Sequence, residues 1–100
     1  MAITKILESY LAFKRVSKQS DKPFSIHAGK LAKVIEGAIN SLDDSKKSIL
    51  VNQYQTSQKH RKTRAQYCKD KDITIEDYIT LRQEALIEFE RYYYNLLHQL

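Results

Sequence analysis

A run of cationic side chains near the middle of the chain comes directly before a residue that can begin a helix. Free backbone amides at a helix N-terminus and neighbouring Lys and Arg side chains both favour phosphate groups. The run is Lys59-His60-Arg61-Lys62-Thr63-Arg64. We predict that these side chains contact the phosphates of a nucleic-acid backbone: Lys59, Arg61, Lys62, Thr63 and Arg64. The alternative is a polar loop whose charges are only solvated.

Other residue types that carry chemistry are few and scattered. His27, His60 and His98 have no carboxylate or second histidine at metal-ligand spacing, so we predict no metal site. The single cysteine, Cys68, lies on an apolar helix face, where a buried small side chain is the usual interpretation. The two glycines are isolated and form no phosphate-binding loop. We therefore predict no cofactor and no enzymatic activity.

The composition is that of one folded, helix-rich domain. The chain has 100 residues, of which 42% are hydrophobic and 29% are charged, with two Gly and one Pro. A lone cysteine excludes a disulfide within the chain and predicts a reducing, cytoplasmic location. No apolar run approaches the roughly 18 residues of a membrane span. Lys5 and Glu8 interrupt the first apolar stretch, so we expect no signal peptide there.

The charge is unevenly distributed along the chain. The formal net charge is +5, and residues 51–74 have six Lys and Arg but only two Asp. Residues 75–100 have two Arg but five Asp and Glu. A basic body with an acidic last segment favours a polyanionic partner such as double-stranded DNA. A solvated surface with no polyanion bound is the alternative.

Apolar residues recur with helical spacing through most of the chain and show no strand-like alternation. We predict an all-α fold of about five helices, at 2–16, 26–40, 43–54, 63–71 and 74–98. The longest apolar stripe is in the last helix and includes Arg82 among its positions. Ala65, Tyr67 and Cys68 are the expected apolar contribution of the fourth helix. Gly37 lies inside the second helix, where close approach of another helix would explain it.

Polar residues mark the expected ends of these helices. Residues 17–25, which surround the only proline, are the clearest linker, and Ser25 is the expected N-cap of the second helix. Ser41 and Asp44 have the spacing of a capping box. Residues 55–62 are expected to form a loop. Thr63 and Thr74 are the expected N-caps of the last two helices.

The arrangement of the last three predicted helices resembles region 4 of the sigma-70 family. The residues that carry the resemblance are SLDDSKKSILVNQY and then TRAQYCKDKDITIEDYITLRQEALIEF, or about residues 42–89. A similar module occurs in small phage late-gene regulators of the ArpU and RinA type. The resemblance implies one domain over 1–100, with an N-terminal helical pair at 1–41 and a helix-turn-helix with an extended last helix at 42–100.

In a helix-turn-helix the first helix crosses the DNA backbone and the second enters the major groove. The resemblance implies that the helix after Thr74 reads bases. Glu76 occupies a position that is often Glu in the family and can accept from cytosine, and Thr80 and Gln83 could also reach base edges. Dipole complementarity at the helix N-terminus is the alternative role of Glu76. The family usually has Arg or Lys at the positions of Ile75, Asp77 and Ile79.

Three consecutive tyrosines, Tyr92, Tyr93 and Tyr94, cannot all face one core, because three helical residues cover most of the helix circumference. At least one is expected to be exposed or in an interface, and a homodimer or a host protein such as RNA polymerase would be the partner. Peripheral packing is the alternative. The sequence thus predicts a phage-like DNA-binding transcriptional regulator. A small helical protein that regulates a host protein through its last helix is the second hypothesis.

Overall fold

Helices form all the regular structure in the described part of the chain, which comprises residues 2–19 and 22–99 of a computed structural model. The helices are α1 (Ala2–Glu8), α2 (Tyr10–Ser17), α3 (Pro23–Asn40), α4 (Asp44–Leu50), the π-helical segment η1 (Val51–Gln55), α5 (Arg64–Lys71) and α6 (Ile75–Leu97). The prediction of an all-α fold with a long last helix is confirmed. None of the helices among these residues is both long and apolar enough to cross a membrane.

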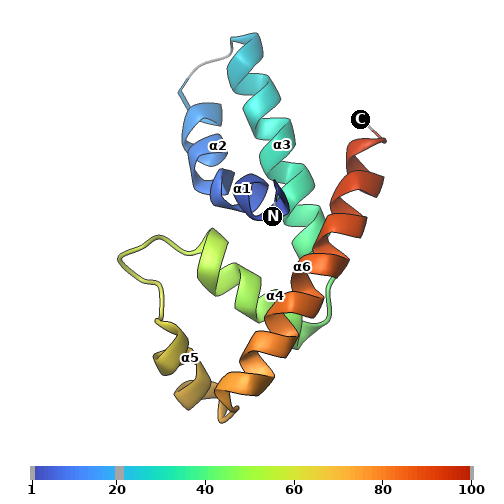
Figure 1. The fold of residues 1–100 in the computed structure, drawn as a ribbon. Coiled ribbons are helices and arrows are strands. Elements are labelled where there is room, and N and C mark those ends of the chain that lie inside the picture. The colour runs from blue at the N-terminus through green and yellow to red at the C-terminus, as the bar shows by residue number, and fades with distance from the viewer. Residues whose placement is uncertain (1, 20–21, 100) are drawn as a thin grey trace.

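The predicted first helix is divided at Ser9, so the prediction of one continuous helix over 2–16 is wrong. The Ser9 hydroxyl donates to the Lys5 carbonyl oxygen at 2.9 Å, one turn earlier. The Ser9 backbone N–H is shared between the carbonyl oxygens of Lys5 and Ile6. Bonding of a serine side chain to the preceding turn competes with regular helix geometry and bends helices. The chain therefore changes direction between α1 and α2, as Figure 1 shows.

The second helix begins earlier than predicted. Pro23 is in its first turn and Lys22 is the N-cap, so the predicted N-cap, Ser25, lies inside α3 and is buried. Proline suits this position because it has no N–H, and the first N–H groups of a helix have no partner within the helix. Of the predicted linker 17–25, residues 20 and 21 lie outside the described residues.

Helix α3 is the central element of the fold. It packs against α2 on one side and against α6 on the other (Figure 1). The Tyr10 hydroxyl of α2 donates to the Glu36 carboxylate of α3 at 2.5 Å. Burial, and then this bond, raise the pKa of Tyr10 above its ordinary value. A Cβ at Gly37 would lie 3.1 Å from Leu96 Cδ1, so the predicted close approach of another helix at Gly37 is confirmed.

A four-residue ionic cluster joins the start of α4 to α6. The N-cap of α4 is Asp43, whose carboxylate accepts from the Lys46 backbone N–H at 3.2 Å, so the predicted Ser41–Asp44 capping box is wrong. The Lys46 ammonium donates to Glu88 and lies 3.7 Å from Glu84, both in α6. The Lys46 side chain is only 15% exposed. The cluster therefore fixes where α4 lies along the middle of α6.

Substitution of Leu50 tests the core between α4 and its neighbours. Leu50 is fully buried. We expect Leu50→Ala to lower the free energy of unfolding by about 3 kcal/mol, because the lost transfer free energy and the cavity both add to the cost. Urea unfolding followed by circular dichroism measures the change. Ile87→Ala, at an exposed position of α6, should change it by less than about 0.5 kcal/mol. Equal losses in the two variants would contradict this assignment of the core.

A pH prediction follows from Asp43. The Lys46 backbone N–H and the Ser45 hydroxyl hold the pKa of Asp43 below its ordinary value of 3.8. A carboxyl whose pKa is lower in the folded state stabilises the fold above the unfolded pKa, and this contribution is lost as the pH falls through the folded pKa. Asp43→Asn retains an acceptor but does not titrate. We expect the urea midpoint of this variant to fall less than that of the native chain between about pH 5 and pH 2. If the urea midpoints of the native chain and of Asp43→Asn fell equally with pH, the prediction would be wrong.

Candidate nucleic-acid interface

Helix α5 begins where the sequence predicts, because Thr63 and Gln66 cap it reciprocally. Thr63 Oγ1 accepts from the Gln66 backbone N–H at 3.2 Å, and Gln66 Oε1 accepts from the Thr63 backbone N–H at 2.9 Å. Thr63 as the N-cap is therefore confirmed. The first helical residue is Arg64, so an exposed cationic side chain lies at the positive end of this helix.

Three residues, 72–74, connect α5 to α6. Asp72 takes up the left-handed conformation with φ 54°, a region that Asp tolerates better than most residues. Thr74 is the N-cap of α6, as predicted, and its Oγ1 accepts from the Asp77 backbone N–H at 3.0 Å. Two short-range constraints, a left-handed residue and a cap, therefore set the angle between the two helices, which Figure 1 shows at its lower end.

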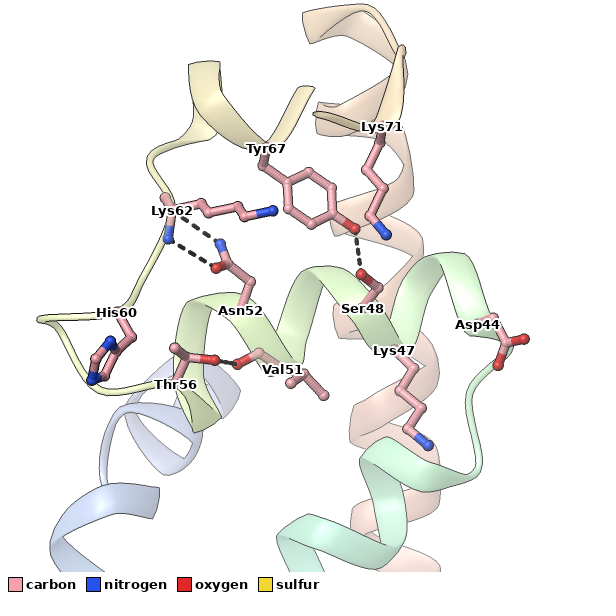
Figure 2. Close-up of a pocket in the computed structure, with 10 residues that line it drawn as sticks. All are labelled: Asp44, Lys47, Ser48, Val51, Asn52, Thr56, His60, Lys62, Tyr67 and Lys71. Atoms are coloured by element: carbon pink, nitrogen blue, oxygen red, sulfur yellow. Dashed lines mark hydrogen bonds between the residues drawn. The ribbon is translucent and has the colours of Figure 1, made fainter. Parts of the chain in front are cut away.

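The side chain of Tyr67 packs α5 against its neighbours. Its hydroxyl donates to Ser48 Oγ of α4 at 2.8 Å (Figure 2), and its ring contacts Tyr78 of α6 edge-on at a centroid distance of 5.6 Å. Tyr67 and Cys68 are buried as predicted. Ala65 is exposed, so its predicted apolar contribution is wrong. The polar face of α5 is left free toward solvent.

The segment 56–63 is held against η1 by Asn52, a residue that the sequence analysis did not identify. Asn52 Nδ2 donates to the Lys62 carbonyl oxygen at 3.1 Å, and Asn52 Oδ1 accepts from the Lys62 backbone N–H at 3.0 Å (Figure 2). Arg61 Nη2 also donates to the Thr56 carbonyl oxygen at 3.0 Å. The cationic residues before α5 are thus fixed to the helical framework by backbone hydrogen bonds.

An open groove lies between the cationic segment and α6. Arg61, Lys62, Thr63 and Arg64 line one side of it, and the α6 residues Tyr78, Ile79, Arg82 and Gln83 line the other, with Asn52 and Gln53. Its volume is about 620 Å³. Five predicted site residues are therefore brought together: Arg61, Lys62, Thr63, Arg64 and Gln83. Glu76 and Thr80 are exposed on α6 outside this lining, and Thr74 caps the helix. Lys59 lines a neighbouring hollow with Lys69 and Asp70.

Comparisons with protein-family models, with curated proteins and with solved structures found no match to this chain. The chemistry of the groove therefore has to be read from its own side chains.

The cationic side chains that line the groove differ in whether they already form an ion pair with a carboxylate. The Lys62 ammonium lies 2.5 Å from Asp70 Oδ2, and this contact lowers the pKa of Asp70. Within residues 2–19 and 22–99, no carboxylate lies within ion-pair distance of Arg61 or Arg64. Arg61 and Arg64 are exposed cations of the groove that an external anion can engage without breaking an ion pair.

Arg82, which shares the apolar stripe of the last helix, is half-buried and hydrogen-bonded to η1. Its Nε donates to Gln53 Oε1 at 2.8 Å, and its Nη2 donates to the Tyr54 hydroxyl at 2.9 Å. These bonds connect α6 to η1 at the base of the groove. A charged residue at a position of the apolar stripe is the sequence signal for such a polar contact between helices.

A second hollow lies between α4 and α5, on the other side of the Asn52–Lys62 contact (Figure 2). Its volume is about 530 Å³. Cationic or potentially cationic residues around it are Lys47, His60, Lys62 and Lys71, and Asp44 is its one carboxylate. The Lys71 ammonium lies 5.9 Å from the centroid of the Tyr67 ring. The positive charge therefore continues around the start of α5 onto this side.

The remaining predicted sites lie elsewhere. Of the three consecutive tyrosines, Tyr93 is buried and stacks on Phe89 at 5.7 Å, Tyr92 is half-buried, and Tyr94 is 41% exposed. The expectation that at least one of them is exposed is confirmed. Among the described residues, no three His, Cys, Asp or Glu side chains are grouped so that they could hold a metal ion.

The Asn52 contact can be tested by removing its side chain. We expect Asn52→Ala to cost about 1–2 kcal/mol of unfolding free energy, because two backbone groups of Lys62 lose their partner. The Lys62 amide should also exchange its hydrogen faster, which NMR-detected hydrogen exchange measures. Gln58→Ala, at an exposed position in the same loop, is the matched control. Unchanged exchange at Lys62 in Asn52→Ala would contradict the role of Asn52.

Proposed function

We propose that this chain binds double-stranded DNA through α5 and the first turns of α6 and regulates transcription. One observation carries the proposal: Arg61 and Arg64 line the same groove as the exposed α6 residues Ile79 and Gln83. The major groove of DNA is about 12 Å wide and admits one α-helix, while the phosphates at its edges attract cations. The arginines would grip a phosphate strand as α6 enters the groove beside it.

Helices α5 and α6 would contact different parts of the DNA. Helix α5 would cross the DNA backbone and present its N-terminal amides and Arg64 to phosphate. The first turns of α6 would enter the major groove with their exposed side chains: Ile75, Glu76, Asp77, Ile79, Thr80 and Gln83. The later turns of α6 are buried against α3 and α4, so the DNA-reading turns project from a rigid helix. Sites built on helices are more precise than sites on loops.

The electrostatics of the surface favour this orientation. Lys59, Lys69 and Lys71 are exposed around α5 and add to the two arginines. Glu76 and Asp77 carry the opposite charge, but they lie in the first turn of α6, where the helix dipole stabilises them. Each phosphate that is neutralised releases counterions, so the affinity would fall with added salt.

The resemblance of residues 42–89 to region 4 of the sigma-70 family supports the regulatory part of the proposal. In that interpretation the chain acts in the cytoplasm as a phage-type late-gene regulator, and RNA polymerase is the natural protein partner. Tyr94 is the exposed member of the tyrosine run and is available for a protein contact. DNA binding remains the primary activity, because the groove and its arginines are the most specific chemical feature of the surface.

Neutral substitutions of the two arginines test the proposal. We expect Arg61→Ala and Arg64→Ala to weaken binding to every duplex by a similar factor, and to reduce the slope of log affinity against log salt by about 1 each. Fluorescence anisotropy with labelled random-sequence and genomic duplexes, titrated between about 50 and 200 mM salt, measures both quantities. Arg91→Ala removes the same charge from an exposed position farther along α6 and is the control.

Two results would contradict the proposal. The first is an absence of salt-dependent association at micromolar concentrations of protein. The second is an equal loss of affinity in Arg91→Ala and Arg64→Ala, which would show that only the net charge matters. Circular dichroism of each variant verifies that the helices are retained, which matters most for Arg61 because its side chain also binds the Thr56 carbonyl oxygen.

A further inference from the structure

One side of α6 next to the groove carries two isoleucines and a glutamine. Ile75, Ile79 and Gln83 are each four residues apart, so they follow one another along one side of the helix. Ile79 and Gln83 line the groove together with Arg64. Ile75 is 39% exposed and Ile79 is 43% exposed, so both isoleucines present apolar surface to solvent. Contact with a ligand would bury the part of each isoleucine that is still exposed in the free chain.

The polar residues of the same turns lie on another side of α6. Glu76 and Thr80 each follow one of these isoleucines, which places them about 100° further around the helix. They are exposed but do not line the groove. A DNA strand held by Arg61 and Arg64 would therefore bring base edges to Ile79 and Gln83, which line the groove, before it reached the carboxylate of Glu76. Ile75 lies one turn before Ile79 on the same side of the helix, outside the groove lining.

The major groove presents one apolar group, the C5-methyl group of thymine, and side-chain carbons bind it by excluding water. The amide of Gln83 can bond adenine in bidentate fashion at N6 and N7. The isoleucines can contact the thymine of an A·T pair and Gln83 can bond its adenine, so all three residues favour A·T pairs. From Ile75 to Gln83 the helix rises about 12 Å, which matches about three to four base-pair steps.

We propose that Ile75 and Ile79 contact thymine methyl groups, and Gln83 an adenine, so that this chain recognises a short run of A·T pairs. The inference rests on the proposed function, since it assigns the bases that the same surface reads. It differs from the expectation for Glu76, which was contact with cytosine. The contact is apolar, so it adds sequence preference without adding to the salt dependence that the arginines supply.

Uracil in place of thymine is the sharpest probe, because it removes only the methyl group and leaves the hydrogen-bonding edge unchanged. The native chain is first used to select binding sites from a random duplex library. The best site is then synthesised twice, once with thymine and once with uracil at every thymine position. Anisotropy titrations at one fixed salt concentration compare the two duplexes with the native chain and with its variants.

We expect the selected sites to be enriched in A·T pairs at their centre. Uracil should weaken binding by about three- to fourfold per contacted methyl group, or about tenfold for two. The double variant Ile75→Ala/Ile79→Ala should bind the two duplexes equally. Ile87→Ala removes an isoleucine that is 56% exposed on the same helix, outside the groove, and should retain the full difference.

Four outcomes would overturn the inference, and they are distinguishable. Selected sites rich in G·C pairs, or equal binding of thymine and uracil duplexes by the native chain, would exclude methyl recognition and leave DNA binding intact. A double variant that discriminates as the native chain does would show that the isoleucines do not contact the methyl groups. Failure of the native chain to bind any duplex in a salt-dependent manner would overturn the proposed function together with this inference.

Discussion

The whole molecule depends on one long helix, one face of which is packed against the core over most of its length. Ala85, Leu86, Phe89 and Tyr93 of α6 lie in the core, where α3 and α4 cover them. The first turns extend beyond this core and are supported at one side by Tyr78 packed on Tyr67. Leu96 packs against Gly37 near the end of α6, and the Lys46 ionic cluster holds its middle. Because a helix is stiff along its axis, these contacts also fix the direction of its first turns.

Features that depend on neighbours along the chain were predictable. Thr63 and Thr74 are caps as expected, because each cap bond closes within three residues of the capping side chain. Two caps differ from the prediction because more than one polar residue precedes the helix. Asp43 caps α4 in place of Ser41, and α3 begins at Pro23, before Ser25. The bend at Ser9 lies in a sequence whose apolar spacing continues without interruption, so periodicity alone could not reveal it.

The site was predictable only in part, because its shape comes from contacts between distant residues. The basic run was visible as composition, but the sequence could not show that Asn52 binds the backbone ten residues away at Lys62. The partners of Arg82, Gln53 and Tyr54, precede it by 29 and 28 residues, so no local pattern indicates its hydrogen bonds to η1. Which ridge of α6 faces the arginines also depends on how α5 is placed. The expectation for Glu76 came from the family resemblance, which does not specify that Ile79 and Gln83 line the groove beside the arginines.

Lys62 holds the cationic segment before α5 in an ordered conformation, while Arg61 and Arg64 stay exposed to solvent. Lys62 is held at two points, since its backbone is bound by Asn52 and its ammonium is paired with Asp70 at 2.5 Å. Its contribution is therefore mainly to fix the segment on the helical framework. On either side of it in the chain are two arginines with no ion pair among the described residues: Arg64, whose guanidinium can bind a phosphate through two parallel hydrogen bonds, and Arg61, whose Nη2 also donates to the Thr56 carbonyl oxygen. Less conformational entropy is lost on binding when the segment is already ordered, so the structural lysine increases what each arginine can contribute.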